Sequence, residues 1–360
     1  MLAGSAAVAA AGTASAIVGV AMYGGDGSQG TASAAKGEPP APTPVPDELA
    51  RPIADPRRRA AHLLRRAGFG GTMAEVDEFA KLSREEAADR LLNFETVDNS
   101  ALNARIEAQQ FNLTTPPGNR QDMIRWWLMR MAYTARPLEE RMTLMWHGLL
   151  TSQVSKVGPQ RAKLLVQQNE LFRKYALPKY DDLLKAVSKD PAMLIYLDTV
   201  DSTREHPNEN YARELMELFS MGVGNYTEDD IRESARAFTG WRLTAPPRQE
   251  IPPGLSEKER RDLQNKYFGE YDPQFVVAQR QHDPGTKTFL GKTGSWSGED
   301  IVDIIMQHPA SSRFMARRLF TEFANFNPDE KTVDTLTKVW DEGGHQVRDV
   351  VRAILVSDEF

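Results

Sequence analysis

The chain has 360 residues, of which 41% are hydrophobic, and it carries 50 acidic against 44 basic side chains. That length and composition are sufficient for a well-buried globular core. The slightly acidic balance, without a basic stripe, argues against nucleic acid as a partner. The chain has no cysteine, which excludes disulfides, thiolate nucleophiles and iron–sulfur clusters and leaves histidine and carboxylates as metal ligands. A nucleotide is not expected, because no phosphate-binding glycine motif stands before a helix, and a haem is not expected either.

Two segments precede the part of the chain that we expect to fold. Residues 1–23 have no charged side chain and are rich in Ala, Gly and Val, which is typical of the apolar core of an export signal. They resemble a twin-arginine signal whose basic segment is missing, and they are more polar than a membrane-spanning helix. Residues 24–46 are rich in Pro, Gly, Ser and Ala, which indicates a linker. We therefore expect export to the periplasm, the cell surface or the medium, with membrane contact only through an uncleaved N-terminal segment.

From residue 47 to residue 360, nearly every segment has the periodicity of an amphipathic helix. Two of the predicted helices begin with a residue pair typical of a capping box, Thr227 with Asp230 and Ser297 with Asp300. We predict one mainly α-helical domain. Its helices are expected at 60–67, 120–135, 138–150, 159–176, 179–187, 191–199, 208–221, 228–238, 299–306, 310–324, 329–342 and 346–357.

The exception is a charged, proline-rich insert between residues 244 and 294. Residues 274–278 and 286–290 are rich in β-branched and aromatic side chains, which favours short strands. Residues 282–285, His-Asp-Pro-Gly, have turn composition. We therefore predict that the two strands pair as a small β-hairpin near 274–290.

The densest group of chemically versatile side chains lies at residues 206–219, on the predicted helix 208–221. A regular 3.6-residue repeat places apolar side chains on one face and polar side chains on the opposite face. Asn208 could cap the helix, and first-turn N–H groups favour an anionic ligand. The catalytic candidates here are His206, Glu209, Glu214 and Glu217, and the substrate-binding candidates are Asn208, Asn210 and Arg213.

The same helix has two other interpretations. Glu209, Arg213 and Glu217 are spaced four residues apart, so they could form ordinary surface ion pairs on a solvated helix. Alternatively, the three glutamates of the helix and His206 could hold a divalent metal, although the pattern lacks the histidine that dicarboxylate helices normally contribute.

Five further residues are candidates, each with a structural alternative. His147 stands among Leu, Met and Trp, which is typical of a core histidine, but it becomes a general base if it faces the helix 208–221. His282 and Asp283 could be presented to a pocket by their loop, with Lys287 contacting an anion, or Asp283 could simply form the turn. Trp241 could stack on a sugar or pack under the insert.

Several segments together resemble one bacterial family, catalogued as domain of unknown function 1800 (DUF1800). The resemblance implies an exported protein, often with a twin-arginine signal. It also implies a partner, encoded beside it, from an uncharacterised family similar to sulfatases and phosphatases. Family members usually continue past residue 360 with further helices. The segments are HLLRRAGFG (62–70), ERMTLMWHGLLTSQ (140–153), DPAMLIYLD (190–198), HPNENYARELMELFSMGVGNYTEDDI (206–231), ARAFTGW (235–241), HDPGTKTFLG (282–291) and GEDIVDIIMQHPASSRFMARRL (298–319).

Two hypotheses for the function follow. In the first, the protein is a hydrolase of an envelope or extracellular polymer, which uses His206 and the carboxylates around residue 210, with His147 or His282 as a proton carrier. In the second, it is a non-catalytic envelope protein for binding or assembly, and the same side chains contact a carbohydrate or a partner. The absence of familiar catalytic signatures motivates the second hypothesis.

Overall fold

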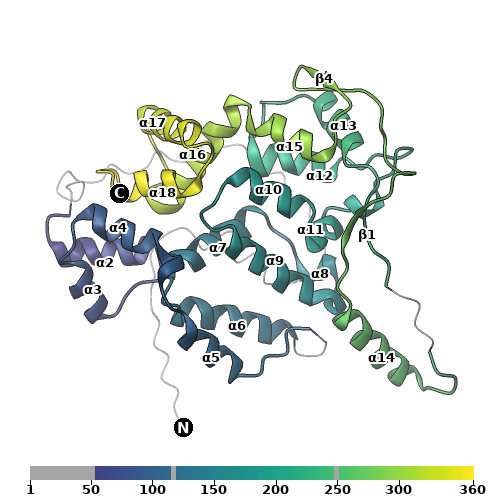
Figure 1. Cartoon of the computed structure of the whole chain (residues 1–360), viewed down its shortest axis with the longest axis horizontal. Coiled ribbons are helices and arrows are strands. Elements are labelled where there is room, and N and C mark those ends of the chain that lie inside the picture. The colour runs from purple at the N-terminus through teal and green to yellow at the C-terminus, as the bar shows by residue number, and fades with distance from the viewer. Residues whose placement is uncertain (1–52, 115–118, 247–250) are drawn as a thin grey trace, which may run out of the picture. The chain divides into compact units, whose positions relative to one another are not determined.

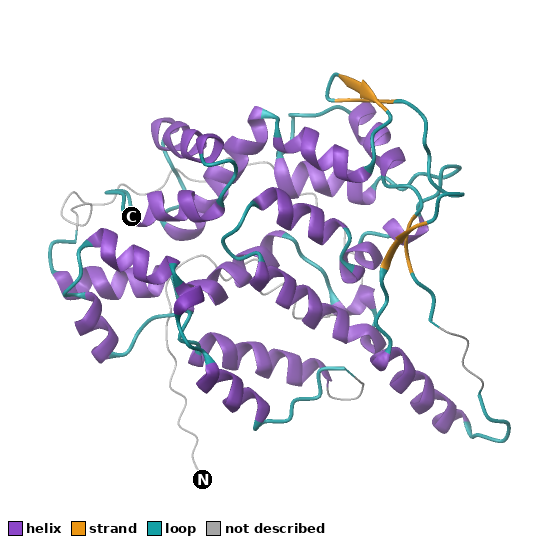
Figure 2. Cartoon of the chain, in the orientation of Figure 1, coloured by secondary structure: helices purple, strands orange, loops and turns teal. Residues whose placement is uncertain are grey.

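The computed structural model describes residues 53–114, 119–246 and 251–360 (Figure 1). The predicted export segment 1–23 and the linker 24–46 lie outside the described residues. The prediction of a mainly α-helical domain is confirmed (Figure 2). The α-helices are α2 (Pro56–Arg66), α3 (Met73–Phe79), α4 (Arg84–Leu92), α5 (Ser100–Glu107), α6 (Asn119–Tyr133), α7 (Pro137–Leu149), α8 (Val154–Val157), α9 (Ala162–Lys174), α10 (Tyr180–Ser188), α11 (Pro191–Tyr196), α12 (Asn210–Glu214), α13 (Glu228–Ala237), α14 (Glu257–Glu270), α15 (Gly298–Met306), α16 (Pro309–Phe323), α17 (Glu330–Glu342) and α18 (Val347–Leu355).

Shorter helical turns connect these elements. They are the 3₁₀ turns η1 (Phe94–Thr96), η2 (Pro159–Arg161) and η3 (Thr199–Asp201), and the π-helical segment η4 (Leu215–Ser220).

Both predicted capping boxes are confirmed. At the start of α13, the N–H of Asp230 donates to Thr227 Oγ1 at 3.2 Å and the N–H of Thr227 donates to Asp230 Oδ2 at 2.8 Å. Ser297 and Asp300 make the same reciprocal pair at the start of α15. Each box satisfies two N–H groups that the helix itself leaves without partners, so these boundaries are fixed locally.

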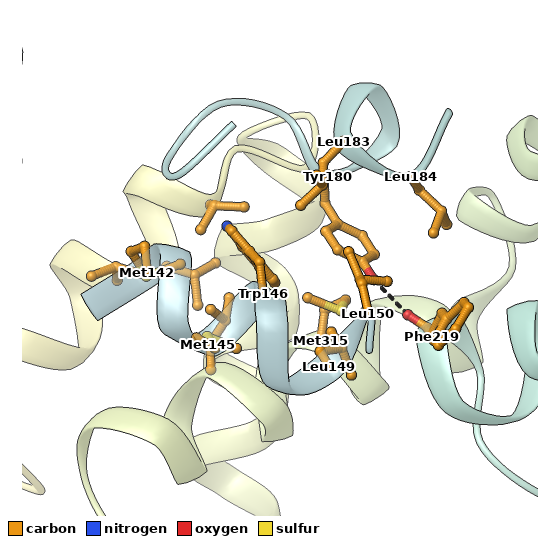
Figure 3. Packing of buried hydrophobic residues seen from close by; sticks show 14 of the residues in the cluster. Met142, Met145, Trp146, Leu149, Leu150, Tyr180, Leu183, Leu184, Phe219 and Met315 are labelled. Atoms are coloured by element: carbon orange, nitrogen blue, oxygen red, sulfur yellow. Dashed lines mark hydrogen bonds between the residues drawn. The ribbon is translucent and has the colours of Figure 1, made fainter. Parts of the chain in front are cut away.

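The main hydrophobic core contains side chains from α2 to α18. Near its centre, the ring centroids of Trp146 on α7 and Tyr180 on α10 lie 5.4 Å apart, and Met315 of α16 is fully buried (Figure 3). The Tyr180 hydroxyl donates to the carbonyl of Phe219 at 2.6 Å, as the dashed line in Figure 3 marks. Because a buried hydroxyl needs a partner, this bond ties η4 to the core.

The two predicted strands exist, but the prediction that they pair with each other is wrong. The first, β2 (Phe275–Val277), pairs antiparallel with β1 (Trp241–Leu243), and the second, β3 (Lys287–Phe289), pairs antiparallel with β4 (Lys292–Gly294) (Figure 2).

Two local causes explain the actual pairing. Leu290 and Gly291 have φ values of 46° and 74°, so they form the two-residue turn with positive φ that closes a tight hairpin. The ring of Trp241 packs edge-on against Phe275 at a centroid distance of 4.8 Å, which holds β1 to β2.

The insert also contains α14, which was not predicted. Its sequence is strongly charged and has almost no apolar face, so periodicity gave no indication of a helix. Ser256 and Glu259 form a capping box at its start, and that pair is the signal that could have located it. Within the described ranges, no helix combines the length and the apolar character needed to cross a membrane.

Candidate functional site

The predicted helix 208–221 changes its geometry in the middle. It begins as α12 at Asn210 and continues from Leu215 as the π-helical η4. The N–H of Met221 donates to the carbonyl of Met216, five residues back, at 2.9 Å. A π-helical turn is wider than an α-turn, so the polar stripe predicted from a 3.6-residue repeat holds only up to Glu214. Such segments are rare and occur frequently at functional sites.

The entrance of α12 is built around Asp198, which has a left-handed φ of 55°. Asn208 donates through Nδ2 to the Asp198 carbonyl at 3.3 Å, and Asn210 donates through Nδ2 to Asp198 Oδ2 at 3.4 Å. Lys156 of α8 forms an ion pair with the same carboxylate at 2.8 Å. The N–H of Asn210 donates to Asn208 Oδ1 at 2.9 Å, so Asn208 satisfies a first-turn donor from one position before the helix cap at Glu209.

Arg213 is held by carboxylates. Its guanidinium donates to both oxygens of Glu228, at 3.0 and 2.9 Å, and to Glu209 at 3.3 Å. The hydrogen bonds from Arg213 lower the pKa of Glu228. The ion pair between Glu209 and Arg213 is the one expected for a solvated helix.

Glu214 and Glu217 have different surroundings. Glu217 accepts a hydrogen bond from the Tyr226 hydroxyl at 2.9 Å. Glu214 is half-buried and makes no hydrogen bond or ion pair with any described residue. Burial, followed by the charge of Glu217, raises the pKa of Glu214. The carboxyl of Glu214 thus holds a proton more readily than a solvent-exposed carboxyl does.

The structure does not join the predicted histidines to these carboxylates. His206 is exposed, and among the described residues no hydrogen bond or ion pair links its imidazole to the three glutamates of the cluster. His147 packs edge-on against Trp127 at a centroid distance of 4.9 Å. Burial lowers the pKa of His147 to about 4, and no carboxylate contributes to that shift. Among the described residues, no carboxylate forms a hydrogen bond with the His147 imidazole, so none orients it as a general base.

His282 and Asp283 bond to the C-terminal end of α13 and to the residue Thr239 that follows it, as well as to their own turn. His282 Nδ1 lies 2.9 Å from the carbonyl of Thr239. Asp283 accepts from Arg236 Nε at 2.8 Å and from the N–H of Gly285 at 2.8 Å, and the guanidinium lowers the pKa of Asp283. The bond from the N–H of Gly285 agrees with the alternative in which Asp283 forms the turn.

Two predicted ligand contacts are buried. Lys287 is 1% exposed, and its Nζ donates to the carbonyls of Asp283 and Gly285 at 2.8 and 3.0 Å. Burial lowers the pKa of Lys287. Trp241 is 4% exposed and packs edge-on against Phe238 at 5.0 Å. Neither side chain is accessible to a ligand in this conformation.

Four residues of the site were not predicted as members: Lys156, Asp198, Tyr226 and Glu228. Each lies in or beside a segment already recognised in the sequence, but nothing in their local pattern indicates that they meet at α12. Within residues 53–114, 119–246 and 251–360, no three His, Asp or Glu side chains are grouped so as to hold a metal ion.

Comparison with known proteins identifies a family. A family model described as "Protein of unknown function (DUF1800)" matches residues 62–360, which is most of the chain. No curated protein and no solved structure matches the sequence.

Proposed function

This chain belongs to the DUF1800 family, and we propose that it is an exported protein that binds a glycan of the cell envelope at the entrance of α12. The observation that carries the proposal is the arrangement of amide and carboxylate groups around Asp198. Asn210 is exposed and Glu209 is partly exposed, and both belong to the turn that the Asp198 network holds.

A glycan presents neutral hydroxyl and amide groups, so its recognition depends on hydrogen-bond donors and acceptors at fixed positions. Asn210 is oriented by its bonds to Asp198 and Asn208, and Asp198 is held by Lys156. Because these groups are ordered before a ligand arrives, less conformational entropy is lost on binding. The π-helical turn that follows α12 also favours a functional role for this surface.

Hydrolysis of the same polymer is a second candidate, and the pair Glu214 and Glu217 favours it. A carboxyl with a raised pKa beside a second carboxyl group is the arrangement that glycoside hydrolases use as acid and base or nucleophile. Burial and the charge of Glu217 raise the pKa of Glu214, while Glu217 accepts a hydrogen bond from Tyr226. Binding ranks first because the imidazoles proposed as proton carriers do not reach this pair.

Co-sedimentation with purified peptidoglycan tests the binding proposal. We expect wild-type protein to pellet with the polymer and Asn210→Ala to bind about fivefold more weakly, since one lost hydrogen bond costs about 1 kcal/mol. The matched control is Asn103→Ala, which removes an exposed amide from α5. Wild-type protein that stays in the supernatant, or equal binding by the two variants, would contradict the proposal.

An assay for soluble reducing ends released from the same pellet distinguishes hydrolysis of the polymer from binding alone. If the protein is a hydrolase, Glu214→Gln will bind the polymer but release nothing, whereas Glu107→Gln, a control at an exposed position of α5, will behave as wild type. If wild-type protein binds the polymer but releases no reducing ends, binding remains as the function and hydrolysis of this substrate is excluded.

A further inference from the structure

A pocket of about 210 Å³ lies where η2 and α9 meet β1 and the segment after α14. It shares no residue with the α12 entrance, so it is a site of its own and does not depend on the glycan proposal. Its walls include apolar side chains, among them Leu164 and Leu243, together with Tyr271. The Tyr271 hydroxyl bonds to Thr244, so its polar end already has a partner.

Among the described residues that line the pocket, three side chains are basic and none is acidic. Arg161 is exposed and forms no ion pair with a described residue. Lys163 forms an ion pair with Asp272 at 3.8 Å, and Asp272 also accepts a hydrogen bond from Gln167. Since Asp272 can offset only one of the three positive charges, the described lining residues carry an excess of positive charge.

Arg242 supplies the most specific observation. Its Nε donates to Gln281 at 2.7 Å, whereas its Nη1 is buried and has no hydrogen-bond partner among the described residues. Buried donors in folded proteins nearly always have partners, and a guanidinium donor without one is costly. An acceptor bound in the pocket would satisfy this group.

We propose that this pocket binds a small organic anion, a carboxylate or a phosphate, that carries an apolar ring or a short chain. Both kinds of anion match the planar donors of a guanidinium. The apolar part would contact the leucines and the Tyr271 ring. A cavity of about 150 Å³ is sufficient for benzene, so this pocket has room for one ring with its charged group.

Isothermal titration calorimetry with phenyl phosphate tests the site, and benzyl alcohol serves as the uncharged analogue. We expect saturable binding of phenyl phosphate, weakened by salt, and binding of benzyl alcohol that is at least about tenfold weaker, because charge-assisted hydrogen bonds are the strong ones.

Three variants complete the test. Arg161→Gln and Arg242→Gln should each weaken phenyl phosphate binding about tenfold. Arg280→Gln, which changes an exposed arginine outside the pocket, should bind as wild type. Arg161 is exposed, so its variant will fold even if the Arg242 variant does not.

The proposal is overturned by any of three results: no binding of phenyl phosphate, equal affinity for the two compounds, or equal affinity of the Arg161 and Arg280 variants.

Discussion

Asp190 is a buried carboxyl whose ionisation should make the stability of the protein depend on pH. It precedes α11, is 4% exposed, and accepts from Gln168 Nε2 at 2.7 Å and from the N–H of Met193 at 3.0 Å. Burial raises the pKa of Asp190 from 3.8 to about 7. Between these two values the folded protein holds a proton that the unfolded chain releases, so the free energy of unfolding falls as the pH rises.

The magnitude follows from the size of the shift. Each pKa unit corresponds to about 1.4 kcal/mol, so the shift of about three units lowers stability by roughly 4 kcal/mol once the pH exceeds 7. From about pH 5 to about pH 8, the part due to Asp190 is roughly 3 kcal/mol. Asp190→Asn keeps an oxygen acceptor for both donors and removes the charge, so the variant should lack this decline.

Urea unfolding at the two pH values measures the effect. We expect Asp190→Asn to be more stable than wild type near pH 8 and close to it near pH 5. The control is Asp182→Asn, at an exposed position of α10, which should keep the pH dependence of wild type. If wild type and Asp190→Asn lose the same stability between the two pH values, the reasoning about burial is refuted.

Two other predictions concern buried or coupled charges. Glu140 is fully buried and accepts two hydrogen bonds from Arg173, so Glu140→Gln should lower the free energy of unfolding by about 3 kcal/mol in urea denaturation; a loss under about 0.5 kcal/mol would contradict this. Burial and Glu217 raise the pKa of Tyr226 to about 12, so Glu217→Gln should lower this pKa in NMR titration of labelled tyrosine, while burial keeps it above about 10. An unchanged pKa of Tyr226 would show that Glu217 does not act on it.

The sequence correctly predicted helices and strands, because these elements depend mainly on residues that are close together in the chain. The helix periodicity and the capping pairs were sufficient for most helices, as Ser297 and Asp300 at α15 illustrate. Strand composition also located β2 and β3. The choice of partner strand was wrong because it depends on contacts between distant segments, such as the packing of Trp241 on Phe275.

The candidate site was predicted only in part for the same reason. The apolar residues between Tyr211 and Phe219 are compatible with an α-turn and with a π-turn, so the sequence could not indicate η4. The hydrogen bond between Asn210 and Asp198 depends on how the folded chain places α12 beside Asp198, which no local sequence pattern indicates. The pocket brings together basic side chains from α9, η2 and β1, which no motif connects.

Hydrogen–deuterium exchange of the full chain, with and without soluble peptidoglycan fragments, tests the central claim most directly. A glycan bound at the entrance of α12 should slow exchange in peptides that cover residues 198–217, because it covers that turn and stabilises it against local opening. Exchange should stay unchanged in α5, which carries the control positions. Unchanged exchange at 198–217 under saturating fragments, or slowing confined to other helices, would contradict the proposed binding site.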